Sequence, residues 1–216
     1  MSTAIIGVGN IGKTVADELV AGGEQVVLAA AEPPETLAGQ LGDLASAATV
    51  SEAINAADAV VFAVWFDVMK SLIEQNRPAL AGKVVVDPAN PVAANEAGEF
   101  VRTLPDGVSA GSVIAPLLPR TAHYVKAFGT LGAASLEKGA NRKPARAVLF
   151  YATDDDQARA TIERLISAAG FDPVKAGGLD ATIRIEMFGD LHDYGGLNGR
   201  LLDVAEARAA VAGELR

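Results

Sequence analysis

A run of glycines near the N-terminus has the spacing of a nucleotide-binding turn. Gly7-Val8-Gly9-Asn10-Ile11-Gly12 follows a short apolar run, residues 4–6, and opens a segment with helical spacing. In such a turn Gly7 permits a sharp bend, Gly9 lets the backbone approach a pyrophosphate, and Gly12 lets helix and strand pack closely. Backbone N–H groups at the helix start then hold the phosphates. The motif therefore predicts a site for NAD(H) or NADP(H).

The residues at the end of the second predicted strand determine the preference between these two nucleotides. An acid there binds the ribose hydroxyls of NAD, whereas Arg or Ser accommodates the 2′-phosphate of NADP. The residues are Ala30, Ala31 and Glu32, and Glu32 stands 20 positions after Gly12, which suits the acid. Strand alternation makes Ala30 the tip, so Glu32 is equally well an exposed loop residue. We assign all three to the cofactor site and leave the choice open.

Two later segments are expected at the same edge of the sheet. Val64 and Trp65 end one apolar strand, and Asn90-Pro91 follow another. Trp65 could lie against the nicotinamide or a planar substrate, or it could pack a loop. Asn90 could present its amide to a ligand, or it could be an ordinary turn residue. We assign Val64, Trp65, Asn90 and Pro91 to the cofactor site, and Trp65 also to the substrate site.

The elements that position these residues alternate along the chain. Apolar runs predict strands over 4–6, 25–30, 59–64, 84–86, 123–128, 146–151 and 171–175. Helical spacing and caps predict helices over 10–21, 35–40, 51–56 (capped by Ser51), 67–75, 109–118 and 154–169. This order predicts an α/β fold: a Rossmann-like, doubly wound, mostly parallel sheet. We expect an NAD(P)-binding domain over 1–180 and a helical C-terminal segment over 181–216, which would mediate dimerisation and border the acceptor site.

Composition excludes several classes of function. The net charge of −9 over 216 residues argues against nucleic acid or an anionic membrane as a partner. The absence of cysteine and the presence of only two histidines leave no thiolate or multi-histidine metal site, so we expect no metal. The sequence shows no signal peptide and no apolar run of membrane-spanning length. We expect a cytoplasmic protein.

Taken together, these segments resemble the NADP oxidoreductase, coenzyme F-420-dependent family, which includes deazaflavin:NADP reductases and the cytoplasmic domain of the STEAP ferric reductases. The resemblance runs through residues 1–180. Its most specific motifs are Asn90-Pro91 and Lys126-Ala127-Phe128, in that order. Other matching stretches are 6–12, 60–65, 87–91, 125–128 with Thr130-Leu131, and 148–171.

The resemblance implies a homodimer with NADPH in the cleft and direct hydride transfer to a flavin-like ring, a step that needs no acid–base residue. It implies that Ala127 and Phe128 belong to the cofactor site and that Gly129, Thr130 and Leu131 belong to the substrate site. The family usually carries Ser-Arg or Thr-Arg where this chain has Ala30-Ala31, which bears on NADP preference. It usually carries Asn where this chain has Gly129, which predicts an opened pocket or a different hydride acceptor.

The C-terminal stretch from Glu186 to Asn198 gathers a histidine, acids and a tyrosine around glycines. On a helix, Glu186 and Asp190 would share one face, and so would Asp190 and Tyr194. His192 with Asp190 or Asp193 could form an acid–base pair, or the stretch could be a dimer-interface helix with satisfied polar groups. We name His192 and Tyr194 as the candidate catalytic residues and add His192 to the substrate site.

Three functions are compatible with these residues. The first is hydride transfer between NADP(H), or NAD(H), and a deazaflavin (coenzyme F-420), a flavin or another small planar acceptor. The second is reduction of a small carbonyl or imine, which would need a proton donor such as His192 or Tyr194. The third is dinucleotide sensing without turnover. All three share one nucleotide fingerprint, so the fingerprint does not separate them.

Overall fold

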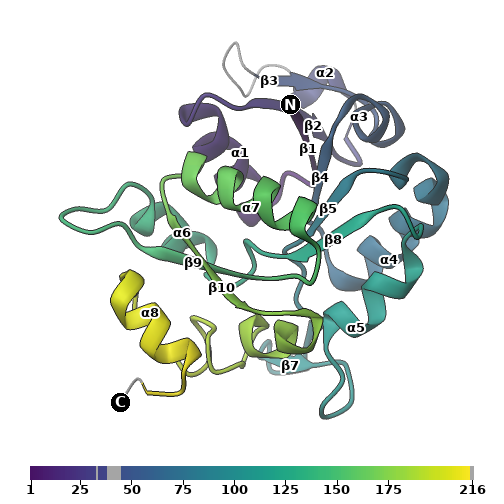
Figure 1. Ribbon diagram of the computed structural model, residues 1–216. Coiled ribbons are helices and arrows are strands. Elements are labelled where there is room, and N and C mark those ends of the chain that lie inside the picture. Colours follow the sequence, from purple (N-terminus) through teal and green to yellow (C-terminus); the bar gives the residue numbers. More distant parts are fainter. Residues whose placement is uncertain (33, 38–44, 215–216) are drawn as a thin grey trace.

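A central sheet organises the molecule (Figure 1). The computed structural model describes residues 1–32, 34–37 and 45–214. The strands of the sheet stand in the order β10-β9-β8-β5-β4-β1-β2-β3. Their bounds are β1 (Ser2–Ile6), β2 (Gln25–Ala29), β3 (Ala45–Ala47), β4 (Ala59–Phe62), β5 (Val84–Asp87), β8 (His123–Lys126), β9 (Val148–Ala152) and β10 (Asp172–Gly177). Among these strands only β8 and β9 pair antiparallel. The predicted Rossmann-like, mostly parallel fold is confirmed.

Helices cover both faces of this sheet. They are α1 (Asn10–Ala21), α2 (Pro34–Leu37), α3 (Val50–Ala56), α4 (Phe66–Asn76), α5 (Ala110–Ile114), α6 (Ala133–Gly139), α7 (Asp156–Ala168) and α8 (Val204–Val211). On one face α1, α6 and α7 pack on side chains such as Val61. On the other face α3, α4 and α5 pack on side chains such as Val60. Neighbouring strand residues point to opposite faces, so a strand buried on both sides is apolar throughout.

Local signals placed most helices correctly. The predicted span of α1 agrees with the structure at both ends. Helix α3 begins one residue earlier than predicted, because Thr49 rather than Ser51 caps it. The Thr49 side chain accepts from the Glu52 N–H, and the Glu52 carboxylate accepts from the Thr49 N–H, which forms a capping box. Of the helix predicted over 35–40, residues 38–40 lie outside the described residues.

Several short elements of the structure were not predicted from the sequence. Strand β3, helix α6 and a hairpin of β6 (Val92–Ala94) and β7 (Phe100–Arg102) were not predicted. The strands β3, β6 and β7 have only three residues each, which is too short to show a periodicity. The hairpin matters for the site, because it rises directly after Pro91.

The predicted helical character of residues 181–216 is wrong for most of that segment. A 3₁₀ helix, Leu179–Ile185, crosses residue 181, turns follow, and α8 is the one α-helix in the described part of the segment. Glycines permit this folding, since a Cβ on Gly189 would lie 2.3 Å from the Arg184 carbonyl oxygen and one on Gly195 would lie 2.0 Å from the Gly189 carbonyl oxygen. The segment packs on β9 and β10 through a third apolar cluster, which includes Leu191. The division into 1–180 and 181–216 remains a prediction.

Candidate functional site at the carboxyl edge of the sheet

The strand order creates a crevice beside β1. Strand β1 lies between β2 and β4, so the chain winds away from it in opposite directions on its two sides. In open α/β sheets ligands bind at such a switch point, outside the carboxyl ends of the strands. The glycine motif follows β1 there, and Trp65 stands just beyond β4. The predicted nucleotide residues therefore meet at one edge.

The glycine loop fits the phosphates of a dinucleotide. Gly7 has φ +102°, and a Cβ on it would lie 2.3 Å from the Ala63 carbonyl oxygen. A Cβ on Gly12 would lie 2.0 Å from the Gly7 carbonyl oxygen, whereas one on Gly9 would meet no atom within 4 Å. Gly9 is also the N-cap of α1 and, having no side chain, makes no side-chain capping bond to that helix. The loop thus leaves open space in front of free backbone N–H groups, with Val8, Asn10 and Ile11 around it.

The tip of β2 offers little to a 2′-phosphate. The Ala29 carbonyl accepts the Gly7 N–H at 2.7 Å, which ties the two strand ends together. Ala30 is half-buried, and Ala31 and Glu32 are exposed. The sequence contains no Lys or Arg between Lys13 and Lys70, and the Lys13 ammonium pairs with Asp17 at 2.6 Å. The choice between NAD(H) and NADP(H) at this tip remains a prediction.

Trp65 is open to solvent. It is the N-cap of α4, its side chain is 62% exposed, and its ring centroid lies 6.3 Å from that of Phe100 in β7. Val64 is half-buried and approaches Gly7 closely enough to crowd a Cβ placed there. An exposed indole beside a nucleotide crevice is available to a planar ligand, whereas a ring that only packs a loop would be covered.

Asn90 joins three segments through its amide. Its Nδ2 donates to the Gly129 carbonyl at 3.0 Å, and its Oδ1 accepts the Met187 N–H at 2.8 Å. The His192 ring nitrogen Nε2 bonds the same Gly129 carbonyl at 2.9 Å. We call these four residues the Asn90 junction. Within it both ends of the Asn90 amide are committed to the protein.

His192 is held as a neutral ring. The side chain is 2% exposed, and the Tyr194 N–H donates to its Nδ1 at 2.9 Å. The other nitrogen must then carry the proton and donate to Gly129. Burial lowers the pKa of His192 to about 4. With both nitrogens occupied, this ring is suited to positioning Gly129.

Of the two alternatives for His192, the acid–base pair with Asp190 or Asp193 is not formed, because both ring nitrogens and both acids have other partners. Asp190 pairs with Arg184 at 2.7 Å, and Asp193 accepts the Gly132 N–H at 3.2 Å. The helical spacing that would have brought Asp190 and Tyr194 to one face is also absent from this stretch. Tyr194 is 61% exposed, and its hydroxyl has no hydrogen bond within the described residues. Tyr194 is thus the more accessible of the two candidate catalytic residues.

The segment that follows β8, residues 127–131, packs mainly into the core beneath the carboxyl edge of the sheet and contributes little to the surface of the crevice. Ala127, Phe128 and Leu131 are buried in the core, and Phe128 has φ +63°. A Cβ on Gly129 would lie 2.3 Å from the Pro88 carbonyl oxygen, so this glycine lets two loops touch and does not widen a pocket. The buried Thr130 hydroxyl has no partner in the described part of the chain.

A buried charge cluster, which sequence reasoning missed, anchors the loop before Asn90. The Lys126 ammonium donates to the Ala89 carbonyl at 2.6 Å and lies 3.5 Å from Asp87 Oδ2. Asp87 accepts the Ala89 N–H at 2.8 Å and the Tyr124 hydroxyl at 2.8 Å. Burial and the Asp87 carboxylate raise the pKa of Tyr124 well above its usual range, so it stays protonated. Tyr124 and Lys126, two polar side chains at alternate positions of a predicted strand, were the available signal.

A second buried pair ties the hairpin to the C-terminal segment. Glu186 is fully buried, accepts the Ala110 N–H at 2.7 Å, and lies 3.2 Å from the Arg102 guanidinium. Burial raises the pKa of Glu186, although Lys126, Ala110 and Arg102 act in the opposite direction. Residues 186–190 form turns and bends instead of a helix. Glu186 and Asp190 do not share a helical face, and the predicted i,i+4 arrangement is wrong.

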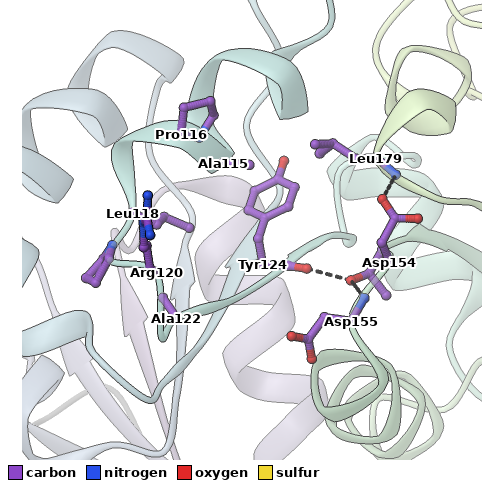
Figure 2. A pocket seen from close by; sticks show the side chains of 11 residues that line it. Ala115, Pro116, Leu118, Arg120, Ala122, Tyr124, Asp154, Asp155 and Leu179 are labelled. Atoms are coloured by element: carbon purple, nitrogen blue, oxygen red, sulfur yellow. Dashed lines mark hydrogen bonds between the residues drawn. The ribbon is translucent and has the colours of Figure 1, made fainter.

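A separate cavity of about 540 Å³ lies at the opposite edge of the sheet, beside the start of β8 (Figure 2). Tyr124 and Leu118 contribute to its wall, and Asp154 and Asp155 face them. The Asp154 carboxylate accepts the Leu179 N–H at 2.9 Å, and Asp155 bonds the His123 ring at 2.7 Å. No predicted site residue lines this cavity.

Comparison with known proteins shows which proteins this chain is similar to. Residues 2–91 match the family described as NADP oxidoreductase, coenzyme F420-dependent. The resemblance inferred from the motifs is confirmed. Metalloreductase STEAP3 of Rattus norvegicus is 30% identical over 185 residues, which are 84% of this chain and 35% of that protein. This chain thus spans about a third of the length of that relative.

Solved structures share the fold. A hypothetical protein from Sinorhizobium meliloti is 28% identical, with a TM-score of 0.80 over 94% of this chain and 95% of that one. A proposed F420-dependent NADP reductase from Arthrobacter sp. FB24 is 21% identical, with a TM-score of 0.70 over 83% and 86%. A reductive aminase from Aspergillus terreus in complex with NADPH and ethyl levulinate is 20% identical, with a TM-score of 0.61 over 84% and 56%.

The prediction of an NAD(P)-dependent oxidoreductase agrees with the family that residues 2–91 resemble, and NADP is the nucleotide that this family's description names. The glycine loop described above has the geometry to hold it. Across the described ranges, no helix combines the length and hydropathy needed to cross a membrane.

Proposed function

We propose that this protein transfers a hydride from NADPH, or less readily from NADH, to a deazaflavin, a flavin or another small planar acceptor. One observation carries the proposal: the polar side chains of the Asn90 junction are already bonded to the protein. The Asn90 amide and both nitrogens of His192 have partners. Hydride transfer between two rings needs proximity and orientation, and it needs no acid–base residue.

The chain supplies binding and orientation. When bound, the nicotinamide nucleotide supplies the hydride. Free N–H groups around Gly9 hold phosphate oxygens, and the exposed Trp65 offers a flat surface beside the crevice. The Asn90 junction keeps the loops after β5 and β8 in register with the C-terminal segment.

A hydride-transfer assay tests the proposal. Purified protein is mixed with NADPH, and separately with NADH, in the presence of oxidised deazaflavin, and the visible absorbance of the deazaflavin is followed. We expect bleaching, faster with NADPH. Nucleotide binding without bleaching would direct the search to flavins, ferric chelates and small carbonyls.

Reduction of a small carbonyl or imine is the second candidate, and Tyr194 favours it. Its exposed hydroxyl, free of hydrogen bonds to the described residues, could donate a proton. Replacing Tyr194 by Phe should abolish carbonyl reduction while leaving flavin reduction unchanged. If Tyr194→Phe slowed carbonyl reduction and flavin reduction equally, Tyr194 would not act as a proton donor specific to carbonyl reduction.

We further propose that the protein acts as a cytoplasmic homodimer on small molecules, with the C-terminal segment at the interface. Light scattering after size exclusion tests the oligomeric state. The third candidate function, dinucleotide sensing without turnover, is tested by the hydride-transfer assay, because a sensing protein would bind NADPH and reduce no acceptor.

A further inference from the structure

An exposed aromatic pair stands beside the carboxyl end of β4. The Trp65 side chain is 62% exposed and that of Phe100 is 45% exposed. Their ring centroids are 6.3 Å apart, and the ring planes are inclined by 43°. Exposed apolar side chains that lie together often mark a site for a ligand or a partner, whereas single ones are ordinary. The pair is therefore a candidate surface for a planar molecule.

The hairpin holds Phe100 rigidly. Residues 100 and 102 point to the same side of β7, and Arg102 is fixed by the buried Glu186 at 3.2 Å. The Thr103 N–H donates to the Pro91 carbonyl at 2.8 Å, which ties the far end of the hairpin to the Asn90 junction. At the turn, Asn95 Oδ1 accepts two backbone N–H groups, at 3.0 and 2.9 Å. The ring pair is thus formed before any ligand arrives.

The cations that border this edge are already neutralised within the described part of the chain. Lys70 pairs with Asp67 at 2.6 Å, Arg102 with Glu186, and Arg184 with Asp190 at 2.7 Å. Lys126 is buried against Asp87 and the Ala89 carbonyl. The hairpin adds Glu96 and Glu99, both exposed. The surroundings of the ring pair are therefore acidic and carry no spare positive charge for an anionic tail.

We propose that Trp65 and Phe100 bind the hydride acceptor, and that this acceptor is an uncharged planar ring, of the isoalloxazine or quinone class, without an anionic tail. This inference rests on the proposed function. A hydride, with its two electrons, passes from the reduced nicotinamide to the ring, and one proton from water completes the reduction. The nicotinamide is oxidised and the ring is reduced, so no further reductant is needed.

Riboflavin and FMN make a matched pair of probes, because they share one ring system and only FMN carries a phosphate. Trp65 is the sole tryptophan of the chain, so quenching of its fluorescence reports binding at this site. We expect riboflavin to bind about fivefold more tightly than FMN at low ionic strength, and the gap to narrow in about 0.5 M KCl as charge repulsion is screened.

Two variants test the role of the ring pair. Phe100→Ala should weaken riboflavin binding about fivefold through loss of one aromatic contact. Val101→Ala is the matched control, since Val101 is 43% exposed on the opposite side of the same strand, and it should leave riboflavin binding unchanged. NADPH affinity, measured by nucleotide fluorescence, should stay constant in both variants.

The outcomes separate this inference from the proposed function. Tighter binding of FMN, or insensitivity of riboflavin to Phe100→Ala, would overturn the inference, while reduction of either flavin would still support the proposed function. If NADPH binds but riboflavin, FMN and the deazaflavin all fail to be reduced, the proposed function itself fails.

Discussion

The two sides of the crevice are built on different principles. The nucleotide side is one continuous backbone turn, residues 7–12, whose binding groups are N–H groups and in which three of the six residues are glycines. The acceptor side joins three distant segments at the Asn90 junction through the side chains of Asn90 and His192, and Asn90 and Met187 are 97 positions apart. A backbone turn depends on local geometry alone, whereas a junction of side chains exists only if the whole sheet is correctly assembled. A bulkier residue in the glycine loop should therefore be enough to disrupt the nucleotide side. The acceptor side should instead be disrupted by the loss of buried hydrogen bonds at the Asn90 junction.

Substitution in the glycine loop gives the largest expected effects and tests the local side. Gly12→Val should cost about 4 kcal/mol of unfolding free energy, because its side chain would collide with backbone. Gly9→Val faces open space, so it should leave stability unchanged and raise the Kd for NADPH about 100-fold. Urea denaturation and nucleotide fluorescence measure the two effects. Unchanged NADPH affinity in Gly9→Val would refute the phosphate site.

Removal of the His192 ring tests the assembled side. His192→Ala leaves the Tyr194 N–H without its acceptor and Gly129 with one donor fewer, and it opens a cavity, so we expect a loss of about 3 kcal/mol. NADPH affinity should change little, because the glycine loop is formed separately. Chemical denaturation with a parallel nucleotide titration provides the measurement. A large loss of NADPH affinity without destabilisation would instead indicate direct contact with the nucleotide.

The pH dependence of stability should report the same ring. His192 has a pKa of about 4 in the folded protein against 6.5 when free, so between these values the unfolded chain binds more protons. Unfolding free energy should fall by about 2 kcal/mol from pH 7 to pH 5 on account of this residue. The raised pKa of Glu186 acts in the opposite direction, so the quantity to compare is wild type minus His192→Asn. A difference that does not vary with pH would contradict the buried neutral ring.

The smallest expected effect is a change in the preference for NADPH over NADH, which tests where the adenosine ribose binds on the nucleotide side of the crevice. Ala31→Arg places a cation at the exposed tip of β2, where the sequence offers none nearby. The ratio of Kd values for NADH and NADPH should shift about tenfold toward NADPH, a change of about 1.4 kcal/mol. Ala31→Gln supplies an uncharged control of similar reach. No shift would place the adenosine ribose away from this tip.

Sequence patterns predicted the scaffold well where one physical requirement acts over a few residues. Strands buried on both faces must be apolar, and a turn of positive φ against a neighbouring backbone requires glycine, so both are visible in the chain. The order of these elements predicted the parallel sheet and the crevice. Patterns failed in the C-terminal segment, where helical composition was overridden by glycine contacts among residues 184–196. They also missed the hairpin that carries Phe100, because strands of three residues leave too little alternation to detect.

The sequence by itself thus determined most strands and helices and the nucleotide turn, because each depends on the pattern of residues that are near neighbours in the chain. Tertiary structure alone decided the roles of the polar residues. His192 pairs with Gly129 and Tyr194 instead of an acid, Glu186 pairs with Arg102, and the Asn90 amide is bonded to the protein. Burial makes each of those groups take a hydrogen-bond partner, and which partner is within reach depends on how distant segments come together.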